Sequence, residues 1–119
     1  MHELSIAMEI VESLTGELME TPGQVDVVRL RVGAFSGVIP EALVFAWEIA
    51  CDGSRFAGSQ LEIADVPVVA RCESCNADRT IESIQLLQCP VCNSPTPDIV
   101  AGKELEIMSV ELTENGQAG

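Results

Sequence analysis

The sequence is poor in aromatic and basic residues. Its 119 residues include one Trp, three Phe and no Tyr, and six Lys and Arg stand against nineteen Asp and Glu, giving a formal net charge of −13. Proteins that bind nucleic acid need cations to neutralise phosphates and aromatic rings to stack on bases. The composition therefore argues against a nucleic-acid-binding protein, and the negative charge equally disfavours binding to an anionic membrane surface.

Long apolar runs and histidines are also scarce. No run approaches the roughly eighteen apolar residues that indicate a membrane helix, and an acidic amphipathic segment stands where a signal peptide would begin. His2 is the only histidine, and no Ser or Cys is placed beside it to form a nucleophile–base pair. We therefore expect a cytoplasmic protein without enzymatic activity.

The apolar fraction of 47% is sufficient for a folded core, and apolar residues recur with the periods of helices and strands. Thr21-Pro22-Gly23 should end a first helix, and Pro40 suits the first turn of a second. The predicted elements, in order, are helix 3–20, strand 25–32, helix 40–51, strand 59–66 and, after an insertion, strand 103–112. The predicted buried stripes are Leu4, Ala7, Met8, Val11, Leu14 and Leu18 on the first helix and Leu43, Ala46, Trp47 and Ala50 on the second.

This order of elements predicts an α+β fold, with two helices on one face of a small three-stranded mixed sheet. Residues 1–68 and 101–113 would form the α/β body, residues 69–100 an inserted module, and residues 114–119 a flexible tail. Cys51 has no cysteine near it in sequence, so we expect it to be an ordinary buried residue.

The insertion contains two Cys-x-x-Cys pairs, Cys72 with Cys75 and Cys89 with Cys92, separated by thirteen residues. Each pair is followed by an asparagine, which tolerates the left-handed backbone conformation that tight turns often need. Four thiolates can complete a tetrahedral shell around Zn²⁺ and leave no open coordination position. The spacing therefore predicts a two-knuckle module around one structural zinc ion.

Disulfides and redox chemistry are the alternatives for these cysteines. Two disulfides would suit a secreted mini-protein, but this chain is long enough for its own core and has five cysteines. A redox Cys-x-x-Cys normally occurs once, beside a helix N-terminus, whereas here two copies lie in a segment rich in Pro and Asn. Both features favour zinc.

The chain resembles the HypA/HybF family of hydrogenase maturation proteins, which are nickel metallochaperones. The resemblance is carried by Met1-His2-Glu3-Leu4-Ser5, by the segment from Arg31 to Gly37 with Pro40-Glu41-Ala42-Leu43, and by the paired knuckles, all in the same order. It implies a cytoplasmic protein that carries Ni²⁺ to the large subunit of [NiFe]-hydrogenase. A HypB-type GTPase would be its partner, with urease accessory proteins in some organisms, and we expect a monomer or weak homodimer.

The resemblance also implies the metal ligands. Nickel would be bound by Met1, through the terminal amine, by His2 and by Glu3, and zinc by Cys72, Cys75, Cys89 and Cys92. Some family members carry a carboxylate near the start of the second helix. The matching residue here is the apolar Ile39, with Glu41 two positions later, so the sequence leaves a further side-chain ligand undecided.

The residues themselves leave two interpretations of the amino terminus. A lone histidine at a chain end is commonly a frayed bystander. Against this, the amine of Met1 with the amide nitrogen and imidazole of His2 can form two adjacent chelate rings, and nitrogen donors in a plane suit Ni²⁺. Two other functions compete with nickel delivery, a zinc-ribbon interaction module and a dithiol oxidoreductase.

Overall fold

The computed structural model describes residues 2–82 and 85–113. Met1 and the predicted tail, residues 114–119, therefore lie outside the described part of the chain. Contacts divide the chain into two compact units. Met1–Leu30, Ile39–Ile63 and Ile107–Gly119 form what we call the helical unit, and Arg31–Val38 with Ala64–Glu106 form the cysteine unit.

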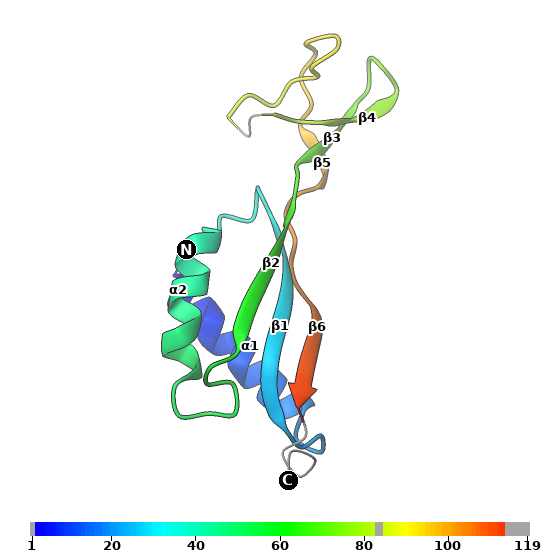
Figure 1. Ribbon diagram of the computed structural model, residues 1–119. Helices are drawn as coiled ribbons and strands as arrows, with labels where there is room; N and C mark the ends of the chain where they lie inside the picture. Colours follow the sequence, from blue (N-terminus) through cyan, green and yellow to red (C-terminus); the bar gives the residue numbers. More distant parts are fainter. Residues whose placement is uncertain (1, 83–84, 114–119) are drawn as a thin grey trace. The chain divides into compact units, whose positions relative to one another are not determined.

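Two helices and the larger part of one sheet build the helical unit, while residues 31–33, 64–66 and 105–106 of the strands belong to the cysteine unit. The helices are α1 (Glu3–Glu17) and α2 (Pro40–Cys51), and the sheet has the order β2-β1-β6, formed by Gln60–Val66, Gln24–Gly33 and Leu105–Thr113. Figure 1 shows both helices on one face of this sheet, with β1 and β2 running in one direction and β6 in the other. The predicted α+β class and mixed three-stranded sheet are thus confirmed.

Large apolar side chains fill the core of the helical unit. Trp47 and Phe56 are buried and meet edge to face, with ring centroids 6.2 Å apart and an interplanar angle of 89°. The Trp47 indole Nε1–H donates to the Ser59 hydroxyl at 2.9 Å, which satisfies the polar end of a buried ring. Cys51, 2% exposed, is buried beside them as predicted.

The start of α2 and the end of α1 each have an identifiable chemical cause. Pro40 occupies the first turn of α2, where its missing N–H costs no helical hydrogen bond. No basic residue lies in the last turn of α1. Arg55 takes that place from a distant loop and donates to the carbonyls of Leu18, Thr21 and Gly23 at 3.0, 2.6 and 2.9 Å.

The buried stripe of α1 differs from the prediction. Ala7 and Leu14 are buried as expected, but Leu4 and Met8 are exposed, and Ile6 and Ile10 take their place in the core. The helix carries two neighbouring apolar rows, and periodicity alone does not identify the row that faces the core.

A second sheet, β4-β3-β5, organises the cysteine unit, and no strand in it was predicted from the sequence. Its strands are β3 (Val69–Cys72), β4 (Ala77–Thr80) and β5 (Asp98–Ala101), and both pairings with β3 are antiparallel. Val68, Ala70 and Ile81 form a small core, against which Leu87 and Ile99 pack.

A close backbone approach joins the Gly33 turn to the chain around Gly102, within the cysteine unit. Gly33 N–H donates to the Glu104 carbonyl at 2.7 Å, and Phe35 N–H donates to the Gly102 carbonyl at 2.6 Å. A Cβ at Gly33 would overlap the Gly102 carbonyl, so only glycine fits at this position.

Candidate metal centre

The four predicted cysteines come together in the cysteine unit. The Sγ atoms of Cys72, Cys75, Cys89 and Cys92 all lie within 4.8 Å of one another. Cys72 Sγ is 3.5 Å from Cys92 Sγ, and Cys75 Sγ is 3.8 Å from Cys89 Sγ. All are free cysteines, and these separations are far longer than a disulfide bond. Each of the two short distances therefore joins one sulfur of the first Cys-x-x-Cys to one sulfur of the second.

These separations fit a tetrahedral thiolate site. With Zn–S bonds of about 2.3 Å, the edge of a tetrahedron is about 3.8 Å, which is close to both shorter distances. Four sulfur donors and tetrahedral packing suit Zn²⁺ better than the oxygen-preferring Mg²⁺ or Ca²⁺. The donor set is thus a four-cysteine metal site of the type that zinc occupies.

In each knuckle a backbone amide donates to the sulfur of the first cysteine, and an asparagine closes the turn. The amide of Cys75 donates to Cys72 Sγ, and the amide of Val91 donates to Cys89 Sγ, both at 3.4 Å. The two asparagines that close the knuckles, Asn76 and Asn93, have φ angles of 53° and 64°, the left-handed conformation predicted for them. Amide-to-sulfur bonds stabilise thiolates, so the turn itself prepares the ligands.

The sulfurs differ in their acidity. Hydrogen bonds from the side chain and backbone of Ser94 lower the pKa of Cys92 to about 6. At Cys72 the amide of Cys75 lowers the pKa, but burial and the hydrogen bonds with the other cysteines outweigh it and raise the pKa to about 11. A metal must displace the remaining protons, so metal binding and proton release are linked at this site.

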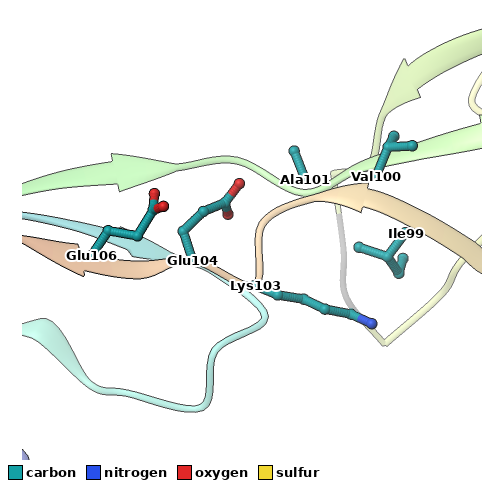
Figure 2. A pocket seen from close by; sticks show the side chains of 6 residues that line it. All are labelled: Ile99, Val100, Ala101, Lys103, Glu104 and Glu106. Carbon is teal, nitrogen blue, oxygen red and sulfur yellow. The ribbon is translucent and has the colours of Figure 1, made fainter.

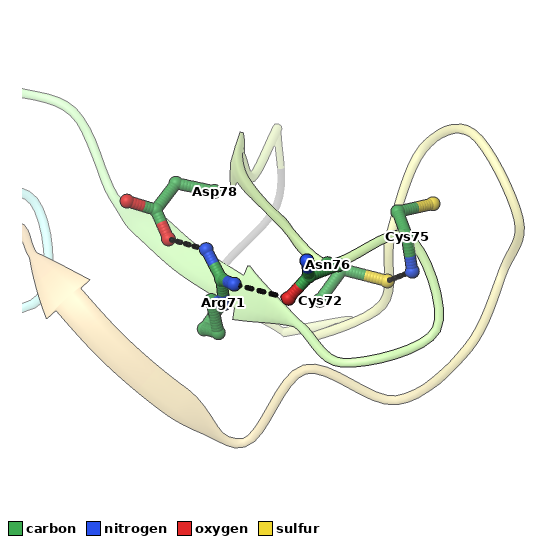
Figure 3. Close-up of polar contacts among 5 residues, drawn as sticks. All are labelled: Arg71, Cys72, Cys75, Asn76 and Asp78. Carbon is green, nitrogen blue, oxygen red and sulfur yellow. Dashed lines mark hydrogen bonds and ion pairs between the residues drawn. The ribbon is translucent and has the colours of Figure 1, made fainter.

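Arg71 supports the first knuckle from its outer side. Figure 3 shows its guanidinium between Asn76 and Asp78, with Nη2 at 2.6 Å from Asn76 Oδ1 and Nη1 at 3.4 Å from Asp78 Oδ1. The contact with Asn76 holds the residue that closes the Cys72–Cys75 turn. Arg71 therefore orders the loop through these two hydrogen bonds, neither of which involves a sulfur atom.

Arg79 is the residue at this site that the sequence reasoning missed. The Cys75 side chain raises the pKa of the Arg79 guanidinium, through hydrogen bonding and through the negative charge of its thiolate. The Cys89 side chain raises this pKa further. The available signal was a cation four residues after a cysteine in a very acidic chain, but it does not say which groups the cation meets.

The second predicted site, at the amino terminus, is described only in part. Met1 lies outside the described residues, and His2 is the exposed N-cap residue of α1. Glu3 Oε2 accepts the backbone N–H of Ile39 at 3.1 Å, and this bond is the main cause that lowers the pKa of Glu3. The Glu3 carboxylate thus reaches the start of α2, the region where the sequence left a further ligand undecided.

A hollow of about 290 Å³ lies elsewhere in the cysteine unit, lined by Ile99–Ala101, Lys103, Glu104 and Glu106. Figure 2 shows the carboxylates of Glu104 and Glu106 on one side and the Lys103 side chain extending away from them. Glu104 accepts the Gly102 N–H at 2.7 Å, and Glu106 lies 3.6 Å from an Arg31 nitrogen. Structural contacts therefore account for both carboxylates.

The helices of the described residues offer no candidate for a membrane span, because none combines sufficient length with sufficient apolar character.

Comparisons with known proteins identify a family. Residues 1–112 match the model of the HypA family, described as hydrogenase/urease nickel incorporation, metallochaperone. A hydrogenase maturation factor HypA from Chloroflexus aurantiacus is 43% identical over 112 residues, covering 93% of this chain and 98% of the relative. One from Desulfosudis oleivorans is 41% identical over 117 residues, covering 96% and 100%.

A solved structure has the same fold. The solution structure of the Ni metallochaperone HypA from Helicobacter pylori aligns with a TM-score of 0.65, covering 97% of this chain and 100% of the other at 21% sequence identity. At that identity the likeness concerns the fold alone.

Proposed function

The chain belongs to the HypA family of metallochaperones for nickel incorporation into hydrogenase and urease, and from this premise we propose that it binds Ni²⁺ through its first three residues. Its role is that of a carrier and not of an enzyme. Ni²⁺ is the cargo, Met1, His2 and Glu3 are the proposed ligands, and the recipient is the [NiFe]-hydrogenase large subunit, with urease as a further recipient. The match over residues 1–112 carries this proposal.

The local structure supports an accessible terminal site. His2 precedes the first turn of α1 and is exposed, so its imidazole can meet a metal ion and give it up again. The Glu3 side chain is bonded to the Ile39 amide, which fixes the direction of the chain at the start of the helix. An ordered helix start with an exposed histidine suits a chelate that has to both bind and release its ion.

Glu3 has two roles open to it at such a site. Its backbone or carboxylate can bind nickel directly, or its carboxylate can hold the terminal residues near α2 while nitrogen atoms bind the metal. The hydrogen bond to Ile39 supports the second role for the carboxylate. On that basis Glu3→Gln should weaken nickel binding less than loss of the imidazole does.

An extension of the amino terminus is the sharpest test. One or two added residues convert the terminal amine into a peptide bond, so we expect Ni²⁺ affinity to fall by orders of magnitude, as in His2→Ala. Equilibrium Ni²⁺ titration of untagged protein measures it, and zinc content and far-UV circular dichroism should stay unchanged in both variants. An extended chain that binds Ni²⁺ as tightly as the native one would place the site elsewhere.

Zn²⁺ is the metal that we propose for Cys72, Cys75, Cys89 and Cys92, in a structural role. When bound, it would supply a fixed tetrahedral link between the two knuckles. The boundaries of the zinc module, residues 69–100, and of the nickel-binding body, residues 1–68 and 101–113, are part of the same proposal. Hydrogen exchange with and without a zinc chelator tests them, since loss of zinc should raise exchange within 69–100 first.

The family's role implies partners in maturation, and for this chain we propose a HypB-type GTPase and the hydrogenase large subunit, in the cytoplasm. The competing function, a zinc-ribbon module without nickel delivery, predicts zinc but no stoichiometric Ni²⁺ uptake. Retention on heparin, a polyanion that mimics nucleic acid, would favour a nucleic-acid role that the charge of −13 opposes.

A further inference from the structure

Arg79 lies on the same face of the small sheet as the first cysteine. In the antiparallel pairing of β3 with β4, Cys72 is opposite Ala77, and Ala70 is opposite Arg79. Successive side chains of a strand point to opposite faces, and paired residues share a face. Cys72, Ala70 and Arg79 therefore share one face, whereas Arg71 and its partner Asp78 occupy the other.

The surroundings of the Arg79 guanidinium are unusual. Its Nε is buried and has no hydrogen-bond partner within the described part of the chain. The Cys75 side chain and, to a smaller extent, the Cys89 side chain raise the pKa of the Arg79 guanidinium, as expected for a cation beside sulfur anions. These two cysteines come from different knuckles, and their Sγ atoms are 3.8 Å apart. One cation is thus influenced by one sulfur from each knuckle.

A four-thiolate zinc site carries excess negative charge, which a nearby cation would offset. Four thiolates and one Zn²⁺ leave two excess negative charges, while Cys72 and Cys89 are fully buried. Buried charge without compensation is costly, and a guanidinium is the side chain best suited to donate several fixed N–H bonds to neighbouring anions. A cation at Arg79 lowers that cost and draws the two knuckles together.

We propose that Arg79 is a positioning residue of the four-cysteine site, which bridges the sulfurs of Cys75 and Cys89 and balances part of the charge of the zinc–thiolate cluster. The proposal rests on the proposed zinc binding. It assigns to Arg79 the retention of zinc, not its coordination, so the site should still form without Arg79 but hold its ion less firmly.

The test compares Arg79→Gln with Arg31→Gln in the zinc-loaded full chain. Both changes remove one arginine from the cysteine unit, but Arg31 pairs with Glu106 and lies outside the sheet that carries Cys72 and Arg79. Groups that support metal ligands typically contribute 10–100-fold to metal affinity, so we expect Arg79→Gln to release zinc to an excess of chelator about tenfold faster. Arg31→Gln should release it within about twofold of the native rate, as expected for an exposed ion pair.

Two further readouts separate charge balance from a general loss of structure. Arg79→Lys keeps the charge but not the planar fork, so its release rate should lie between those of the native chain and Arg79→Gln. In the cobalt-substituted protein, the thiolate-to-cobalt charge-transfer absorption should shift in Arg79→Gln and stay unchanged in Arg31→Gln. If Arg79→Gln fails to fold, Arg79→Lys should restore both folding and zinc content.

Native release rates and an unshifted absorption in Arg79→Gln would overturn the proposal. So would an Arg79→Lys variant as defective as Arg79→Gln, since charge would then not matter. Failure of the proposed zinc binding would show separately, as a native chain that takes up no zinc at its four cysteines, and would remove this proposal with it.

Discussion

The helical unit and the cysteine unit bury different kinds of side chain. The helical unit buries Trp47, Phe56, Leu30 and Leu43, each almost completely. The buried residues of the cysteine unit are smaller, led by valines, Ala70 and two cysteine thiols. A fully buried Val, Leu, Ile or Phe contributes roughly 1.5–3 kcal/mol, and among the described residues the cysteine unit buries fewer of these side chains than the helical unit does.

The difference shows that one short chain can combine two sources of stability. The helical unit relies on apolar burial, which needs no ligand. The cysteine unit has a small core and a set of ligands already directed toward one point, so a bound metal would provide much of its folding free energy. Changes at the metal ligands and changes in the apolar core should therefore have separable effects.

The largest effect should come from removing two metal ligands. We expect Cys75→Ser with Cys92→Ser to lose zinc and to unfold the cysteine unit, because structural zinc contributes about 10–16 kcal/mol in small zinc-dependent domains. Metal analysis and two-dimensional NMR measure it, and resonances of the helical unit should keep their dispersion. Cys51→Ala serves as the control and should keep full zinc content. An unchanged cysteine unit in the double variant would contradict the comparison.

The next effect should come from Trp47→Ala in the helical unit. It removes the edge-to-face contact with Phe56 and leaves a cavity, so the free energy of unfolding should fall by about 3–5 kcal/mol. Urea unfolding followed by circular dichroism measures the loss, and zinc content should be unaffected. Phe45→Ala, on the same helix but 70% exposed, should change stability little. Equal losses from the two variants would mean that Trp47 is not a core residue.

A smaller effect should come from backbone packing in the cysteine unit. Gly33→Ala places a methyl group against the Gly102 carbonyl and the Glu104 amide, neither of which can move as a side chain can. We expect a loss of about 1–3 kcal/mol, measured as a lower melting temperature. Gly16→Ala is the matched control, because nothing lies within 4 Å of its Cβ and the helix should gain roughly 0.5–1 kcal/mol. Changes of the same sign in both would contradict the packing seen here.

Much of the fold could be predicted because the residues that begin and end its helices and strands act locally. Pro40 marked the start of α2, and its end at Cys51 preceded Asp52-Gly53 as expected. The alternation of Val28, Leu30 and Val32 identified β1. The end of α1 was placed three residues too late, because the helix stops at Glu17, ahead of the Thr21-Pro22-Gly23 signal that was used to end it.

The unpredicted parts depend on contacts between distant residues. The strands β3, β4 and β5 are only four residues long, and sequences such as Ala77-Asp78-Arg79-Thr80 carry no clear apolar alternation. They form because pairing and the cysteine cluster hold them together. The Cys-x-x-Cys spacing predicted the ligand group, but it could not show that Arg79 shares a sheet face with Cys72, since that placement follows from strand register.

The pairing of the arginines has a consequence for how fast metal ions reach the chain. Arg29 and Arg31 pair with carboxylates, Arg55 bonds to carbonyls and Arg71 to Asn76 and Asp78, and Arg79 has its proposed place beside sulfur. Because these cations are paired within the chain, the excess of carboxylates determines the electrostatic field around the protein. Such a field enriches divalent cations near the surface over about one Debye length, roughly 10 Å at 0.1 M salt. Ion capture should then slow as salt is added, while the rate of release changes less.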